Sequence, residues 1–153
     1  MSKASPSVFT RALRAVFARH SNPWSAWSRW ATAPLAMVPV WTRNWKHLGA
    51  VAVWFAINPV LFPEPADDRA WSTRAMLGEE QWLLERPKDA AMAVNAAASA
   101  VGLAAIVAAG RRRPLATGAA SATAMALLLV YWELMARYYE DHQNRAADDR
   151  PVR

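Results

Sequence analysis

Two long, uninterrupted apolar blocks constrain the fold of this chain more than any other feature. Residues 90–109 carry no charged side chain, and after a short turn with three arginines residues 115–132 form a second uncharged block. Helices of these lengths span about 27–30 Å at 1.5 Å per residue, close to the hydrocarbon thickness of a bilayer. We therefore expect an all-α membrane protein that forms a single membrane domain over residues 1–153.

Two further apolar blocks, residues 24–41 and 48–62, predict about four transmembrane helices in total. The first contains Arg29, which we expect to snorkel toward the nearer interface, and Pro34 and Pro39, which we expect to kink the helix. Because the connector between these blocks is so short, they would form a tight helical hairpin.

The remaining segments are polar. Residues 7–19 place arginines opposite an apolar face and predict an amino-terminal amphipathic helix lying in the interface. Residues 63–89 predict short interfacial helices between spans 2 and 3, starting near Pro65 and stopping at Gly78. Residues 137–153 are expected to form a solvated polar tail.

The distribution of Lys and Arg predicts the orientation. With four spans, thirteen of the 18 basic residues fall on the side of the termini and five on the other, so both termini are expected in the cytoplasm of a multi-pass cell-membrane protein. The arginine cluster Arg111–Arg113 opposes this arrangement, because four spans place it outside. If block 24–41 lay in the interface, three spans would remain and the cluster would face the cytoplasm.

Composition narrows the classes of partner and chemistry. The net charge of +6 fits either nucleic acid or anionic lipid headgroups. Six of the nine Trp lie at the margins of apolar blocks and favour the bilayer. We therefore expect lipid and anionic headgroups as partners, and no nucleic acid. The absence of cysteine excludes disulfides, thiolate metal sites and cysteine nucleophiles.

Two polar residues belong to the apolar blocks. Asn95, within residues 90–109, is expected to hydrogen-bond between helices, with a transport path as the alternative. Glu133 directly follows the last block, where an ionisable group is often functional. Arg137 lies four residues later on the same helical face, so an ion pair at the interface is the favoured interpretation.

Three separated motifs resemble one known family. They are His20–Ser25 (HSNPWS), Asn58–Pro63 (NPVLFP) and Leu77–Glu79 (LGE) with Trp82. Together they resemble a family of small prokaryotic membrane proteins of unknown function, over about residues 18–140. The resemblance implies a membrane location and no catalytic residue. With four spans the motifs would meet on one face, where a shared polar site is predicted from His20, Asn22, Asn58, Asp67 and Glu79.

These patterns predict a small polytopic membrane protein without an assignable reaction. No cofactor, metal or catalytic residue is predicted, because no phosphate-binding loop, dinucleotide fingerprint, nucleophile elbow or metal-ligand spacing is present. Small residues at four-residue spacing favour packing between spans or copies: Ala96, Ala100, Ala104 and Ala108 in one block, and Gly118, Ala122 and Ala126 in the other. The leading hypothesis is a non-enzymatic packing or partner-binding component, alone or as a homo-oligomer. The alternatives are a membrane enzyme or ion-handling protein that uses boundary polar residues, and a transporter accessory subunit.

Overall fold

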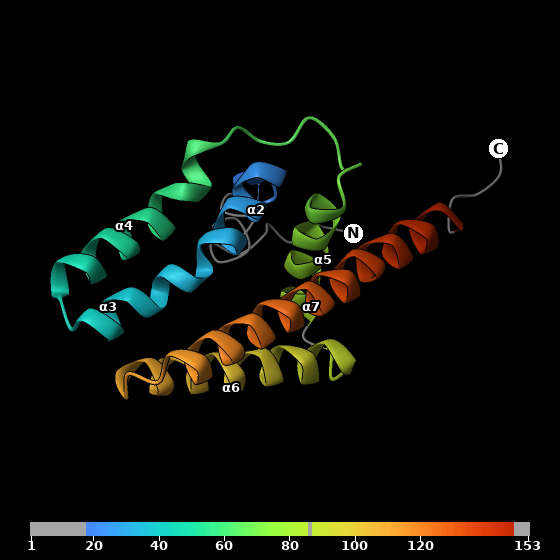
Figure 1. Cartoon of the computed structure of the whole chain (residues 1–153). Coiled ribbons are helices and arrows are strands. Elements are labelled where there is room, and N and C mark those ends of the chain that lie inside the picture. The colour runs from blue at the N-terminus through green and yellow to red at the C-terminus, as the bar shows by residue number, and fades with distance from the viewer. Residues whose placement is uncertain (1–17, 86, 149–153) are drawn as a thin grey trace.

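The computed structural model describes residues 18–85 and 87–148, and this part of the chain is helical without strands. The helices are α2 (Pro23–Thr32), the 3-10 helix η1 (Ala33–Ala36), α3 (Met37–Thr42), α4 (Trp45–Leu61), α5 (Trp71–Glu85), α6 (Ala90–Gly110) and α7 (Pro114–Asp148) (Figure 1). The expectation of an all-α fold is confirmed. The predicted helix 7–19 lies outside the described residues except for Ala18 and Arg19, which are helical.

Helices α6 and α7 form an antiparallel hairpin (Figure 1). Asp89 begins α6 because its carboxylate accepts the amide N–H of Met92, at 3.0 Å. The turn after Gly110 passes through Arg112, which has a φ of 53°. Pro114 then opens α7, where its missing N–H has no cost.

The contact between α6 and α7 is present, but of the small residues predicted for α6 only Ala108 is buried. Ala96, Ala100 and Ala104 are exposed, as are Gly118 and Ala122 on α7. The other buried positions of α6 are Ala91, Ala105 and Ala109, which were not predicted. An alanine-rich helix offers small residues on every face, so spacing alone does not select the face that packs.

The first apolar block is a broken helix. Asn22 caps α2 and Pro23 stands at its first turn, while Pro34 coincides with the 3-10 segment that separates α2 from α3. A proline inside a helix removes one hydrogen bond and clashes with the preceding turn, so the predicted interruption has its expected cause. Arg43, with a φ of 52°, forms the turn to α4, which Asn44 caps.

Helix α5 differs from the prediction at both ends. It begins at Trp71 instead of near Pro65, and it continues through Gly78 to Glu85. Gly78 does not stop the helix: it faces α7, and a Cβ built there would lie 1.9 Å from the carbonyl oxygen of Met135. The glycine therefore permits a close approach of two helix backbones.

The polar segment that begins at residue 137 is helical as far as Asp148. Helix α7 continues to Asp148 and lies beside α5, where Arg74 pairs with Glu140 at 2.9 Å and His142 with Glu85 at 3.1 Å. Packing on α5 thus makes residues 137–148 part of the helical structure. Tyr139 is buried, whereas residues 140, 141 and 143–148 are exposed to solvent.

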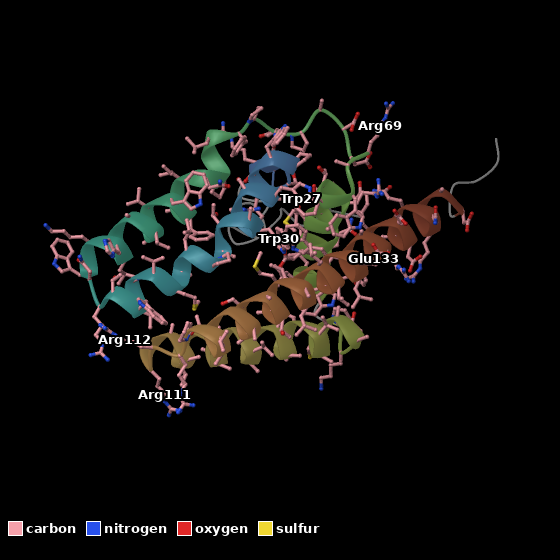
Figure 2. All side chains as sticks on the ribbon, in the orientation of Figure 1. Trp27, Trp30, Arg69, Arg111, Arg112 and Glu133 are labelled. Atoms are coloured by element: carbon pink, nitrogen blue, oxygen red, sulfur yellow. The ribbon has the colours of Figure 1, made fainter. Side chains whose placement is uncertain are left out.

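Helix α4 runs back beside α2 and α3 as a first hairpin, and α6 and α7 form the second. The turns of both hairpins lie at the same end of the molecule. The Arg43 guanidinium donates from Nη2 to the carbonyl oxygen of Gly110 at 3.4 Å, and α3 packs against α6. Figure 2 shows Arg111 and Arg112 at this end and Glu133 and Arg69 toward the other. The buried apolar core lies toward the Glu133 end, and consists mainly of Ala26, Ala75, Met76, Trp82, Tyr131, Trp132 and Met135 from α2, α5 and α7.

Two described helices, α6 and α7, are long and apolar enough to cross a membrane. Only 11% of the most apolar window of each is buried within the chain. Helix α4 has 17 residues, and block 24–41 is interrupted at η1, so spans at 24–41 and 48–62 stay predictions.

Candidate polar site at one end of the helices

A buried cluster of three polar side chains joins α2 to α4. The hydroxyl of Ser25 donates to Oδ1 of Asn58 at 2.9 Å, and Nδ2 of Asn58 donates to the hydroxyl of Ser28 at 2.8 Å. Asn58 and Ser25 are both 0% exposed. Burial of these groups is compensated because each finds a hydrogen-bond partner.

Two further hydrogen bonds connect segments that are distant in sequence. Asn22 accepts the N–H of Trp24 at 2.9 Å as the cap of α2, and its Nδ2 donates to the carbonyl of Pro63 at 3.0 Å. Thr73 of α5 donates to the carbonyl of Ser21 at 2.8 Å. The start of α2 is therefore tied both to the end of α4 and to α5.

Arg29 is directed back toward the beginning of α2. Its Nε donates to the carbonyl of Ser25 and its Nη2 to the carbonyl of His20, both at 3.1 Å. Its Nη1 lies against both ring nitrogens of His20, 2.6 Å from Nε2. The guanidinium thus points toward the polar end of the molecule, in the direction predicted for a snorkelling arginine.

The carboxyl of Glu79 reaches the same place from α5. It accepts the hydroxyl of Tyr131 at 3.3 Å, and Arg29 influences it by charge without forming an ion pair with it in the described structure. Burial raises the pKa of Glu79, against the opposing effects of Tyr131 and Arg29. Burial, and then the nearby charge of Arg29, lower the pKa of His20 to about 4.

His20, Arg29 and Glu79 line one cavity of about 250 Å³. Its other walls are apolar and come from α2, η1, α4, α5 and α7: Trp30, Ala33, Phe55, Met76, Leu128 and Trp132. Trp30 also donates to the carbonyl of Met125 at 3.3 Å, which holds α2 against α7. The cavity therefore combines one guanidinium, one carboxyl and one imidazole with hydrophobic walls.

Tryptophans surround this end of the site. The ring centroids of Trp27 lie 5.7 Å from Trp30 and Trp132 and 5.9 Å from Trp71, in edge and stacked arrangements. Figure 2 shows Trp27 and Trp30 at the junction of the two hairpins. Such contacts between aromatic rings are each worth about 0.5–1.5 kcal/mol beyond area burial, so this cluster helps hold α2, α5 and α7 together.

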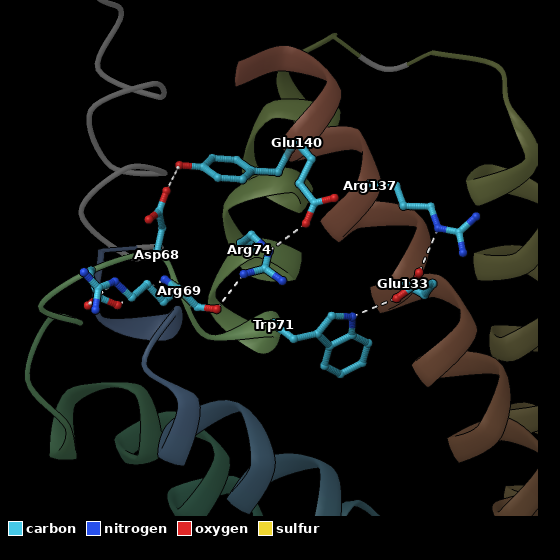
Figure 3. A network of polar contacts seen from close by, with 9 residues as sticks. Asp68, Arg69, Trp71, Arg74, Glu133, Arg137 and Glu140 are labelled. Carbon is cyan, nitrogen blue, oxygen red and sulfur yellow. Dashed lines mark hydrogen bonds and ion pairs between the residues drawn. The ribbon is translucent and has the colours of Figure 1, made fainter. Parts of the chain in front are cut away.

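Glu133 lies beside the tryptophan cluster. The indole N–H of Trp71 donates to its Oε2 at 2.8 Å, and Nε of Arg137 pairs with its Oε1 at 2.7 Å (Figure 3). The predicted ion pair at i,i+4 is therefore present. Close by, Arg74 pairs with Glu140, and Asp68 accepts the hydroxyl of Tyr139 at 2.9 Å.

The predicted polar site is brought together only in part. His20 and Glu79 line the cavity, whereas Asn22 and Asn58 are engaged in hydrogen bonds between helices. Asp67 is exposed and does not join them, because it accepts the N–H of Arg69 at 3.0 Å within its own loop.

Asn95 also departs from its expected role. It is exposed on α6, and no hydrogen bond to another helix is found for it within residues 18–85 and 87–148. The helix-joining amide is Asn58 instead. A polar residue inside an apolar block can face either way, and sequence does not decide which.

Several contributors were missed at the level of sequence: Ser25, Ser28, Arg29, Thr73 and Tyr131. Arg29 carried a signal, since a charged residue inside an apolar block is costly and commonly functional. Ser25 and Ser28 lie three residues apart on α2, which is the spacing of one helical face. Thr73 and Tyr131 offered no comparable signal, because their partners lie 52 residues away along the chain.

The chemistry available at the site is binding and proton exchange. Within the described residues, no group of three or more His, Asp or Glu side chains is placed to hold a metal ion. Glu79 and His20 can exchange protons, and Arg29 can pair with an anion. The serine hydroxyls at the site donate to Asn58 or to backbone carbonyls.

Comparison with known proteins supplies a family. Neither the curated proteins nor the solved structures searched give a significant match to the chain. The model of a family of unknown function (DUF6653) matches residues 10–149, which include every motif described above. The prediction of an uncharacterised family is confirmed, and the chain belongs to this family of unknown function (DUF6653).

Proposed function

We propose that the chain is a polytopic integral membrane protein that acts as a non-enzymatic packing or partner-binding component. The observation that carries the membrane location is the exposure of apolar side chains on helices of spanning length. Leu103 is 62% exposed on α6 and Leu115 88% exposed on α7. A water-soluble protein rarely exposes such continuous apolar surface, whereas lipid covers it without penalty.

The arrangement of the hairpins favours four spans over three. The turns at Arg43 and Arg111–Arg113 lie at the same end, and α4 also exposes large apolar residues such as Leu48 and Val53, each 58% exposed. If α6 and α7 cross the bilayer, the adjacent α2–α3 segment and α4 reach the same depth. Both termini and α5 would then share the cytoplasmic face, as the excess of basic residues predicts.

The hydrogen bonds of the polar motif residues support a role in packing. The motif residues Asn22, Ser25 and Asn58 all join segments of the chain by hydrogen bonds. Hydrogen bonds between helices in membranes contribute about 0.6–2 kcal/mol each, so these residues are explained by stability alone. On this proposal Glu79→Ala is tolerated. A membrane enzyme or ion-handling protein is the second candidate, favoured by the cavity that His20 and Glu79 share.

Membrane insertion is tested by extraction and flotation. The chain should stay in the pellet after alkaline carbonate treatment and float with lipid vesicles after reconstitution. Recovery in the soluble fraction under both conditions contradicts the proposal. Loss of a cellular phenotype in Glu79→Ala at native abundance favours the second candidate.

The number of spans is tested by labelling single cysteines, because the chain contains none. Ser5→Cys and Ala66→Cys report the two ends of the first hairpin, and Leu115→Cys reports the arginine turn. With four spans, a membrane-impermeant maleimide labels the first two from one side and Leu115→Cys from the other. Ala97→Cys, exposed in the middle of α6, should react only after solubilisation. Labelling of Ser5→Cys and Ala66→Cys from opposite sides establishes three spans instead.

A further inference from the structure

We propose that the cavity between α2, α4, α5 and α7 binds the phosphate group of an anionic membrane lipid, and that Arg29 pairs with this phosphate. The inference rests on the membrane location proposed above. It goes further by assigning a ligand class and a binding residue to one site. The argument uses the charge in the cavity, the geometry of Arg29, the depth of the site and its walls.

The charge in the cavity favours an anion. The titratable groups that face it are Arg29 and His20 from the first segment and Glu79 from α5; Tyr131 of α7 donates to Glu79. His20 has a pKa of about 4 and is neutral near pH 7. Burial raises the pKa of Glu79, which disfavours the negative charge that would oppose an anion in the cavity. Arg29 is the positive group of the cavity.

Arg29 is held in place and keeps donor capacity. A guanidinium has five N–H donors. Nε donates to the carbonyl of Ser25, Nη2 donates to the carbonyl of His20, and Nη1 lies against both ring nitrogens of His20. Nη2 also contacts the sulfur of Met76, at 4.0 Å, which is a weak acceptor. A phosphate oxygen in the cavity offers a much stronger acceptor, and guanidinium is the side-chain group best suited to phosphate.

The depth of the cavity matches a lipid phosphate. Leu128 and Trp132 line it from the last turns of the apolar part of α7, and Trp30 lines it from α2. Tryptophan rings concentrate at the headgroup level of membranes, so the cavity lies where the apolar region ends. Glu133 and Arg137 follow immediately on α7 and mark the polar side.

The size and walls of the cavity fit a headgroup with the start of its acyl chains. A volume of 250 Å³ equals the liquid volume of about eight waters, at roughly 30 Å³ each, and is too small for a whole diacyl lipid. Phe55 of α4 and Leu128 of α7 provide apolar walls from both hairpins.

Native mass spectrometry of the full-length chain in neutral detergent tests this site. The protein is titrated separately with phosphatidylglycerol, phosphatidylcholine and inorganic phosphate. We expect one phosphatidylglycerol to bind with at least tenfold preference over phosphatidylcholine. Equal affinity for the two lipids overturns the proposal. Displacement of phosphatidylglycerol by millimolar inorganic phosphate also overturns it, because the ligand is then the free anion.

Variants assign the binding to the cavity. Arg29→Gln should lower phosphatidylglycerol affinity about tenfold, and Arg29→Lys should lower it less because the charge remains. Arg137→Gln is the matched control, since it removes an arginine at the same end of the molecule but outside the cavity. An equal loss in Arg137→Gln, or an unchanged affinity in folded Arg29→Gln, refutes the assignment.

A cavity-filling variant decides the question if Arg29→Gln does not fold. Ala33→Leu adds volume to the wall and leaves every charge in place, so it should weaken binding of phosphatidylglycerol; full binding contradicts the site. The membrane proposal is judged separately by flotation with phosphatidylcholine vesicles. A chain that floats but shows no preference for phosphatidylglycerol refutes only the lipid site, whereas a chain that does not float refutes the membrane location.

Discussion

Replacement of Gly78 by alanine should destabilise the protein because α5 and α7 approach so closely there. A Cβ at this position would lie 1.9 Å from the carbonyl oxygen and 2.8 Å from the carbonyl carbon of Met135, and 3.3 Å from Cβ of Tyr139. Real Cβ atoms essentially never come within 3.0 Å of such atoms, so the helices would have to separate by at least the missing 1.1 Å. The obstructing atoms are backbone, and no change of rotamer can move them away.

The net effect follows from two opposing contributions. Alanine is favoured over glycine inside a helix by about 1 kcal/mol. Overpacking of a well-packed core costs about 1–3 kcal/mol, and the absence of a flexible obstacle places this site near the upper value. Gly78→Ala should therefore lose about 2 kcal/mol of stability. For a chain of this length that corresponds to a fall in Tm of about 4–8 °C on the scale known for soluble proteins.

Thermal unfolding in detergent, followed by circular dichroism, measures this effect, and the chain provides a matched control. Gly102 lies in α6 with no atom within 4 Å of a built Cβ. Gly102→Ala should therefore leave the Tm unchanged or raise it through helix propensity alone. A Gly78→Ala variant as stable as native protein, or as stable as Gly102→Ala, would show that α5 and α7 do not pack as described.

Three further predictions concern particular side chains. Asn58→Ala should cost about 1–2 kcal/mol, because the buried hydroxyl of Ser25 loses its acceptor and the half-buried hydroxyl of Ser28 loses a donor. Asn95 is exposed, so Asn95→Ala should keep the native Tm, and equal losses in the two variants would contradict this difference. Burial lowers the folded-state pKa of His20 to about 4 from 6.5, so the unfolded chain takes up the proton first. The free energy of unfolding should then fall by on the order of 1–3 kcal/mol as pH drops from 6.5 to 4. His20→Gln should reduce this loss and flatten the acid side of a Tm-against-pH profile; identical acid sides in the two proteins would refute this role of His20. Tyr139→Phe removes the hydrogen bond to Asp68 and should lower the free energy of unfolding by about 1 kcal/mol in the same assay. Native stability in this variant would show that α7 does not pack against the α4–α5 connection there.

Local interactions account for the features that were predicted correctly. The apolar blocks 90–109 and 115–132 correspond to α6 and to the first half of α7, since uninterrupted apolar length and a nearby cap suffice to specify a helix. The break near Pro34 and the ion pair of Glu133 with Arg137 also depend on residues within one or two helical turns. The candidate site was predicted in part, because motif residues at the ends of apolar blocks tend to meet at one boundary.

What the amino-acid sequence determined by itself was the helical class, the hairpin of residues 90–132 and the concentration of polar motif residues at helix ends. Only the tertiary structure decided that Gly78 is a contact point, that Asp67 stays outside the site and that residues 137–148 extend α7. The physical reason is that helix formation follows from neighbours three or four residues apart. The choice of which helix faces meet depends on contacts between residues tens of positions apart, such as Tyr131 with Glu79, and periodicity does not encode these partners.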